Sequence, residues 1–241
     1  MSRKIATQLV VAAALFAQAH PAHAGLDLTW SACNLGPGAA SNLTLDCVGG
    51  EPARLFGSFQ VPYDFDFVSD MFATLEVRTA SGDLPSFWQM GAGGCNEGAI
   101  LLTHLMPSSA CPAPPFVSPW PGTVFQELGY APDLQHPGRA TLNLHLLHKV
   151  REPYALRAGV NYFGFLVTIS TARAPQCAGC ADPVVLIWSS ARFVKLTGNS
   201  LTLTGPGLVS QCATVNGAPP GLCAATPARR HTWGAIKSLY Q

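Results

Sequence analysis

Short segments in which every second residue is apolar, each ended by a turn, constrain the fold of this chain more than any other feature. Residues 140–148 alternate through Leu142, Leu144 and Leu146, and residues 162–169 are rich in aromatic and β-branched side chains. A period of two is the pattern of a half-buried β-strand, and aromatic and β-branched side chains fit a pleated surface. Both segments therefore predict strands.

Turns separate such segments along the whole chain, which contains 23 glycines and 20 prolines. About ten short strands with frequent turns are typical of a β-sandwich. We therefore predict an all-β fold: a single antiparallel β-sandwich, jelly-roll-like, formed by residues 25–204. The expected strands are 26–31, 43–45, 55–61, 72–77, 84–90, 140–148, 162–169, 184–188, 193–196 and 200–204, and residues 100–105 form either a further strand or a short helix.

The first 24 residues have the features of a secretory signal peptide. Arg3 and Lys4 form a charged start, residues 5–17 form an apolar run, and residues 22–24 (Ala-His-Ala) fit the cleavage rule. The apolar run is shorter than the roughly 20 residues that cross a bilayer. We expect cleavage after this segment and no membrane span in the mature chain. The expected location is extracellular or periplasmic, either free or attached to the cell surface.

All eight cysteines follow the predicted signal peptide, and an even number in an exported chain indicates disulfides. A metal site would need a second C-x-x-C or a His pair at matching spacing. A redox dithiol at residues 177–180 would need a helix after it, whereas a strand is predicted there. The cysteines form four couples close in sequence, so we predict the pairs Cys33–Cys47, Cys95–Cys111, Cys177–Cys180 and Cys212–Cys223.

The composition changes at residue 205. Residues 205–228 are rich in Gly and Pro and are predicted to form a tether, and residues 229–241 form a C-terminal tail element. We expect a short C-terminal helix in this tail, which either docks on a sorting or partner protein or packs back on the sandwich. The apolar residues at helix-like spacing are Trp233, Ile236 and Tyr240.

Charged side chains are scarce: 14 Lys and Arg and 13 Asp and Glu make up 11% of the chain, less than half the roughly 25% usual in soluble domains. A nucleic-acid binder needs a basic surface, so we expect no nucleic-acid partner. Carbohydrate binding uses exposed aromatic rings instead. The candidate ligand-binding residues are Trp88, Tyr130 and Trp120, which lies in the proline-rich loop 107–121. The alternative for Trp120 is that it packs this loop down.

Asp64, Asp66 and Asp70 lie in one predicted loop, and carboxylates in a flexible loop suit calcium. Their spacing fits no EF-hand, so we expect a solvated loop and no cofactor, with calcium as the alternative. His145 and His148 are three positions apart on a predicted strand and therefore point to opposite faces. We expect solvent-facing histidines there instead of a zinc site.

No catalytic motif stands out in the sequence. The G-x-S-x-G elbow of serine hydrolases is absent, and the acidic residues form no evident pair of facing carboxylates. We therefore predict a non-catalytic secreted or cell-surface binding or structural module whose partner is a glycan or another surface or secretion protein. The alternative is an extracellular hydrolase of envelope or polysaccharide substrates.

Three segments resemble a group of uncharacterised secreted bacterial proteins. The segments are 25–33 (GLDLTWSAC), 177–184 (CAGCADPV) and 232–240 (TWGAIKSLY). Members of the group open the mature chain with a similar strand ending in Cys, carry a similar C-x-G-C turn and end in a W-G-x-I/V-K-x-L-Y-R tail; this chain ends in Gln241 instead of arginine. The resemblance implies a secreted β-sandwich and, since no activity is assigned to the group, no catalytic residue.

Overall fold

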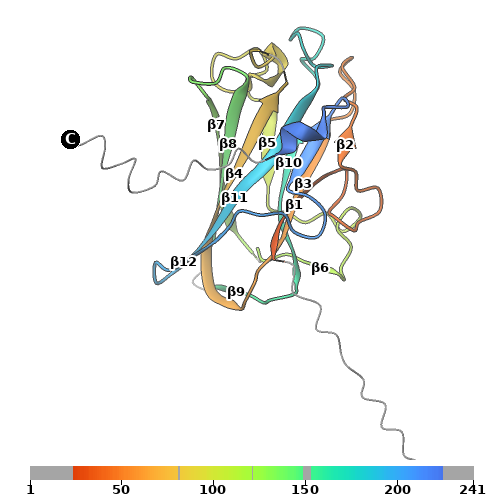
Figure 1. The fold of residues 1–241 in the computed structure, drawn as a ribbon. Coiled ribbons are helices and arrows are strands. Elements are labelled where there is room, and N and C mark those ends of the chain that lie inside the picture. Colours follow the sequence, from red (N-terminus) through yellow and green to blue (C-terminus); the bar gives the residue numbers. More distant parts are fainter. Residues whose placement is uncertain (1–23, 81, 121, 149–152, 225–241) are drawn as a thin grey trace, which may run out of the picture.

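The computed structural model describes residues 24–80, 82–120, 122–148 and 153–224. In these residues the chain forms two packed β-sheets, with no α-helix (Figure 1). The short helical turns are η1 (Ser86–Trp88) and η2 (Pro220–Cys223). No helix in these ranges is long and apolar enough to cross a membrane. The all-β, two-sheet prediction is confirmed, whereas residues 1–23 of the predicted signal peptide and the tail at 229–241 lie outside the described residues.

Most strand pairs in both sheets are antiparallel. The smaller sheet has the order β1 (Gly25–Trp30), β3 (Ala53–Gln60), β10 (Asn161–Ile169) and β5 (Ile100–Thr103), with β6 (Phe116–Val117) on β10. The larger sheet has the order β2 (Asn42–Leu43), β13 (Cys212–Val215), β11 (Val184–Lys195), β4 (Phe65–Thr79), β8 (Arg139–His148) and β7 (Val124–Pro132), with β12 (Ser200–Leu203) on β11 and β9 (Tyr154–Leu156) on β4. The pairs β2–β13 and β6–β10 are parallel, which departs from the antiparallel prediction at two short strands.

The alternation in β8 has the predicted effect on burial. Leu142, Leu144 and Leu146 are buried, and the residues between them are at least partly exposed. From the smaller sheet the Phe165 ring meets the Trp188 ring of the larger sheet, with centroids 4.7 Å apart. Burying one large apolar side chain contributes about 1.5–3 kcal/mol, so this interior between the sheets is the main source of stability.

Several elements differ from the predicted strands. Residues 84–90 contain the turn η1, because Pro85 lacks a backbone N–H to donate and Phe87 and Trp88 turn into the core. The sequence pattern also misses β7, the end strand of the larger sheet. Most residues of β7 are exposed, and on its half-buried face the polar Gln126 stands between the apolar Val124 and Leu128, so its sequence shows no clear alternation.

Four disulfides join segments of the described chain. They are Cys33–Cys111, Cys47–Cys180, Cys95–Cys177 and Cys212–Cys223. The predicted sequential pairing is therefore wrong except for the last pair. Cys177 and Cys180 are neighbours in sequence, but each is bonded to a different loop. Four disulfides indicate an oxidising environment, such as the cell exterior or the periplasm.

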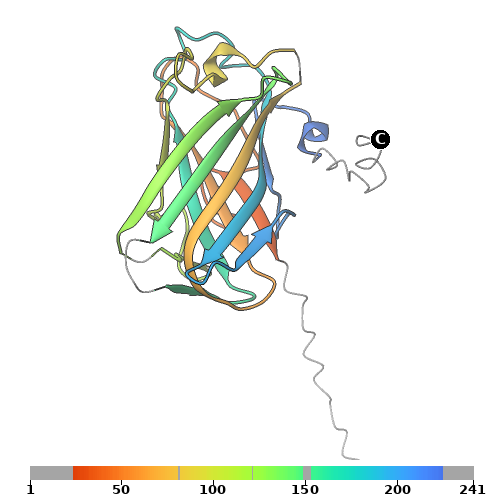
Figure 2. The same cartoon turned by 90° about the vertical axis from the view of Figure 1, so that its left-hand side faces the viewer.

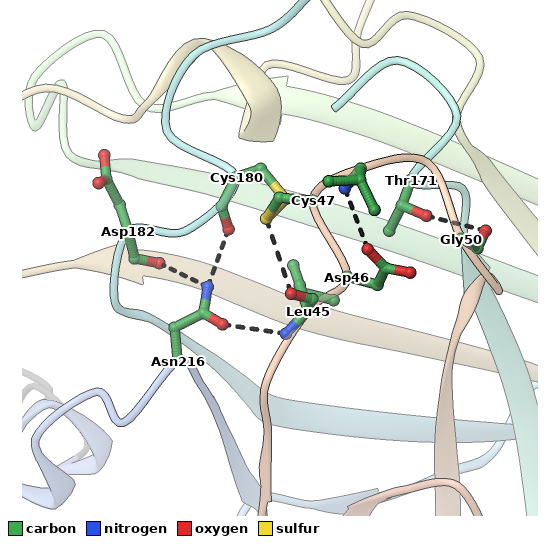
Figure 3. Close-up of a disulfide and its surroundings, with 9 residues drawn as sticks. Leu45, Asp46, Cys47, Gly50, Thr171, Cys180, Asp182 and Asn216 are labelled. Atoms are coloured by element: carbon green, nitrogen blue, oxygen red, sulfur yellow. Dashed lines mark hydrogen bonds between the residues drawn. A yellow bond between two sulfur atoms is a disulfide. The ribbon is translucent and has the colours of Figure 1, made fainter. Parts of the chain in front are cut away.

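Figure 3 shows the Cys47–Cys180 disulfide beside Asn216, the residue that follows β13. The backbone N–H of Leu45 donates to Asn216 Oδ1 at 3.0 Å, and Asn216 Nδ2 donates to the carbonyl oxygen of Cys180 at 2.8 Å. One side chain thus joins three segments. Residues 205–224, which the composition assigns to a tether, instead contribute β13 and η2 to the folded domain.

Candidate functional site

The three aromatic residues suggested as ligand contacts lie in different environments. Trp88 is fully buried and Trp120 is 5% exposed. The Trp120 indole N–H donates to the Gly164 carbonyl oxygen at 2.9 Å and so holds the proline-rich loop against β10. Tyr130 is half-buried and lines a hollow beside β7. Of the three, Tyr130 is the residue that a ligand can reach.

The three aspartates suggested as calcium ligands do not converge. Arg157 Nη1 lies 3.3 Å from a carboxylate oxygen of Asp64 and 2.8 Å from one of Asp66. Asp70 lies further along β4 and interacts with His145. A single arginine therefore pairs with the first two carboxylates. Across the described residues, no group of three or more His, Cys, Asp or Glu side chains is placed to hold a metal ion.

His145 and His148 have different surroundings on β8, as their odd spacing predicts. His145 is partly exposed, whereas His148 is 7% exposed. His148 Nε2 lies 3.0 Å from the carbonyl oxygen of Pro119, and its ring centroid lies 5.3 Å from that of Trp120. The expectation of a solvent-facing side chain is therefore wrong for His148, which packs beneath the proline-rich loop.

Four side chains form a row across the outer face of the larger sheet, the face that Figure 2 shows. We call them the cross-strand row; in order across the sheet they are Arg192 on β11, Phe72 on β4, His145 on β8 and Glu127 on β7. Each residue is directly opposite the next in the strand register. Directly opposite side chains lie close enough to interact, so this row combines a cation, two rings and a carboxylate.

Both faces of the Phe72 ring are covered. The His145 ring stacks on it with the centroids 4.2 Å apart and an angle of 12° between the planes. Arg192 Cζ lies 4.8 Å from the Phe72 centroid, and β11 and β8 flank β4 on opposite sides. Stacking of a cation on an exposed ring contributes about 0.5–1 kcal/mol. The three side chains therefore order one another on an open sheet face.

Asp70 orients the imidazole of His145. Asp70 Oδ1 lies 2.9 Å from His145 Nε2, and Asp70 Oδ2 accepts a hydrogen bond from the Ser69 hydroxyl at 2.5 Å. The side chains of His145 and Asp70 are only 23% and 19% exposed. A carboxylate on one ring nitrogen fixes the role of the other, so His145 presents a defined edge to the surface.

A shallow hollow of about 270 Å³ opens beside the cross-strand row. Gly129 of β7, which has no side chain, is one of the residues that line it. Groups that donate and accept hydrogen bonds surround this space together with the two rings. The side chains at its border are Phe72, Thr74, Glu127, Asn143 and His145.

Ser69 is not arranged as a catalytic nucleophile. Its hydroxyl lies within hydrogen-bond distance of Asp70 Oδ2 and of the Val194 carbonyl oxygen, 3.2 Å away. A serine nucleophile needs its hydroxyl against the histidine that removes its proton. Here serine and histidine both contact the aspartate, so the site holds a histidine in place without activating Ser69.

The outer face thus joins an ordered row of side chains to an open, polar hollow. A fold of two β-sheets hosts many unrelated functions, so function has to be argued from these side chains. No protein-family model matches the sequence, and neither a curated protein nor a solved structure matches it.

Proposed function

We propose that this chain is a secreted or cell-surface binding module, without catalysis, that binds a neutral saccharide on the outer face of its larger sheet. The observation that carries the proposal is the hollow between the cross-strand row and Gly129. Sugar-sized ligands are recognised in concave sites with a few fixed polar groups beside apolar surface. The cross-strand row supplies such fixed groups.

The chemistry of the border favours a neutral, polyhydroxylated ligand. Thr74 and Asn143 can each donate and accept hydrogen bonds, while Glu127 accepts them. Hydroxyl groups of a sugar also donate and accept, so they can satisfy all three side chains. The negative charge of Glu127 disfavours a carboxylate or a phosphate at the same place. The rings of Phe72 and His145 add apolar contact for a sugar C–H face.

The proposal includes export and a jelly-roll-like topology. The four disulfides support export, because disulfides are rare in the reducing cytoplasm. In the smaller sheet β3 pairs with β10, and the next strands along the chain, β4 and β11, pair in the larger sheet. Two strand pairs that cross together from one sheet to the other support a jelly-roll arrangement.

Binding can be tested with immobilised neutral oligosaccharides, followed by calorimetry on those that are retained. We expect Asn143→Ala to weaken binding about tenfold, because a lost hydrogen bond to a polar ligand costs roughly 1.4 kcal/mol. Thr141→Ala is the matched control, since Thr141 lies two residues away on β8 and does not border the hollow. Equal affinities of the two variants, or no retained saccharide, would contradict the proposal.

A second candidate, an extracellular hydrolase of polysaccharides, is favoured by one observation. His145 has a carboxylate on each neighbouring strand: Asp70 is hydrogen-bonded to it and Glu127 is directly opposite it. Paired carboxylates are the usual machinery of glycoside hydrolysis. The same retained oligosaccharides distinguish the two functions. A binding module releases them unchanged, whereas a hydrolase gives shorter products that disappear in Glu127→Gln.

A further inference from the structure

The chain that follows β13 lies on the outer face of the larger sheet, the face that carries the cross-strand row. Val185 and Ile187 of β11 are buried on this face, where Leu222 of η2 packs against their apolar cluster. Ala224 is the last described residue, and its carbonyl oxygen accepts a hydrogen bond from Arg78 Nη1 at 3.2 Å. The C-terminal chain therefore covers part of β11 and reaches β4.

Ala224 ends near the hollow beside the cross-strand row. The same Arg78 donates from Nε to Glu76 Oε2 at 2.9 Å. Thr74, which borders the hollow, is the next residue of β4 on this face after Glu76. Two positions along a strand measure about 7 Å. The segment 225–241, which we call the C-terminal segment, therefore begins beside the hollow.

Trp233 of the C-terminal segment can reach the far wall of the hollow. Gly129 on that wall is two strands away from Thr74 in the register, or about 10 Å. Trp233 follows Ala224 by nine residues. Nine residues span up to about 30 Å when extended and still about 13 Å in a helix. The segment is therefore long enough in either conformation.

The hollow offers an indole ring both apolar contact and hydrogen-bond acceptors. Its accessible wall is mostly apolar, and the two rings of the cross-strand row stand at its border. A buried tryptophan needs an acceptor for its N–H, and the Glu127 carboxylate and the Asn143 amide oxygen supply one. At Gly129 the atoms nearest to an added Cβ belong to Asn143 and are 3.9 Å away, so the wall has room.

Charge also favours the C-terminal segment as the occupant of the hollow. The segment has no Asp or Glu, and its charged side chains are Arg229, Arg230 and Lys237. Glu127 is exposed at the β7 end of the cross-strand row, and within the described chain no cation forms an ion pair with it. Arg192 is at the opposite end of the row. A cation of the segment can therefore pair with Glu127.

We propose that the C-terminal segment docks on the outer face of the larger sheet of its own molecule and inserts Trp233 into this hollow. The docked ring occupies the space that a ligand of the hollow needs, so the segment regulates access to the site. This regulation rests on the proposed saccharide function, whereas the docking itself does not.

The test measures how strongly acrylamide quenches the fluorescence of Trp233 in the full-length protein, with no saccharide present. The other four tryptophans are at most 5% exposed: Trp30, Trp88, Trp120 and Trp188. The emission that disappears in Trp233→Phe therefore reports on Trp233. Each variant below is measured together with its own Trp233→Phe partner.

Gly129→Phe fills the hollow from an exposed position on β7. We expect it to raise the quenching constant of Trp233 about tenfold, which corresponds to docking that is favourable by about 1.4 kcal/mol. Thr202→Phe is the matched control, because Thr202 is also exposed on a strand of this sheet, opposite Arg192, and does not border the hollow. It should leave the quenching constant at the parent value.

Glu127→Lys is a second variant at an exposed position, so the test does not depend on the folding of Gly129→Phe. It removes the acceptor and repels the cations of the segment, and it should also raise the quenching constant while circular dichroism stays unchanged. Equal quenching of Trp233 in the parent, Gly129→Phe and Glu127→Lys would overturn the docking site. Quenching that weakens as the protein concentration rises would assign Trp233 to a second copy and overturn docking within one molecule. A protected Trp233 in a protein that retains no saccharide would support the docking and contradict only the proposed function.

Discussion

At the scale of single residues, Asp27 on β1 is a buried carboxylate surrounded by donors. Asn34 Nδ2 donates to it at 2.6 Å, and the backbone N–H groups of Leu208, Val209 and Ser210 donate at 3.0, 2.6 and 3.0 Å. Burial raises the pKa of Asp27, and these hydrogen bonds oppose that rise without cancelling it. Asp27 therefore fastens the segment before β13 to the first strand at an electrostatic cost.

Replacing Asp27 by Asn keeps the shape but turns an NH2 group toward backbone donors, so we expect Asp27→Asn to lower the unfolding free energy by about 1–3 kcal/mol. Folding raises the pKa of Asp27 above its ordinary 3.8. The stability linked to this proton is thus fully present below that pH and is lost as the pH rises through the folded pKa. Asp27→Asn has no carboxyl at this position and does not lose this stability. In urea titrations, the difference in unfolding free energy between the parent protein and the variant should therefore become smaller as the pH rises.

Asp133→Asn is the control, because Asp133 has the opposite shift. The hydrogen bond with His136 lowers the pKa of this exposed carboxyl. The contribution of Asp133 to the stability of the fold is therefore present above the ordinary pKa of an aspartate, and it is lost as the pH falls through the lower pKa of Asp133 in the folded protein. If the difference in unfolding free energy between the parent protein and Asp27→Asn became larger toward neutral pH, the role given to Asp27 would be contradicted.

At the scale of elements, the sequence predicts the strands whose residues alternate between apolar and polar or are rich in aromatic and β-branched side chains. β8 alternates because its apolar residues face the core, and β10 is recognisable from its aromatic and β-branched residues. β7 is missed because most of its side chains meet water. β13 is missed because it has four residues between glycine- and proline-rich turns, and its pairing with β11 places it in the sheet.

The candidate site was visible in the sequence only as separate residues. Asp70 and His145 each carry chemistry that a reader of the sequence can notice. Their neighbours Phe72 and Arg192 do not, because only the register of β11, β4 and β8 brings them beside His145. Register depends on the packing of the whole sheet, so the row could not be predicted from spacing along the chain.

The tether boundary gives a prediction about elements. A chain that ends at Thr204 lacks β13, the backbone donors of Asp27 and the Cys212–Cys223 disulfide. Since buried groups without partners cost about 1–3 kcal/mol each, we expect it not to fold. A chain that ends at Ala224 keeps these contacts and should melt cooperatively, as measured by circular dichroism. If the chain that ends at Thr204 instead melted cooperatively at the same temperature as the full-length protein, this would support a tether that begins at residue 205.

At the scale of the whole molecule, three disulfides close long stretches of chain. The separations are 78 residues for Cys33–Cys111, 133 for Cys47–Cys180 and 82 for Cys95–Cys177, against 11 for Cys212–Cys223. Which cysteines pair depends on which loops meet after the sheets have packed. Proximity in sequence carries this information for the short loop alone, and for that reason it predicts one pair of the four.

Loop length predicts how much each disulfide stabilises the protein. In the chain-entropy account, closing a loop of more than 100 residues contributes about 5 kcal/mol and closing one near ten residues about 3 kcal/mol. We therefore expect the double variant Cys47→Ser/Cys180→Ser to lose about 2 kcal/mol more unfolding free energy than Cys212→Ser/Cys223→Ser, measured by guanidinium titration. Asn216 contacts the Cys180 carbonyl, so Asn216→Ala should cost less in the variant without Cys47–Cys180 than in the parent. Equal losses for the two double variants would mean that native contacts around Cys223, not loop length, decide the ranking.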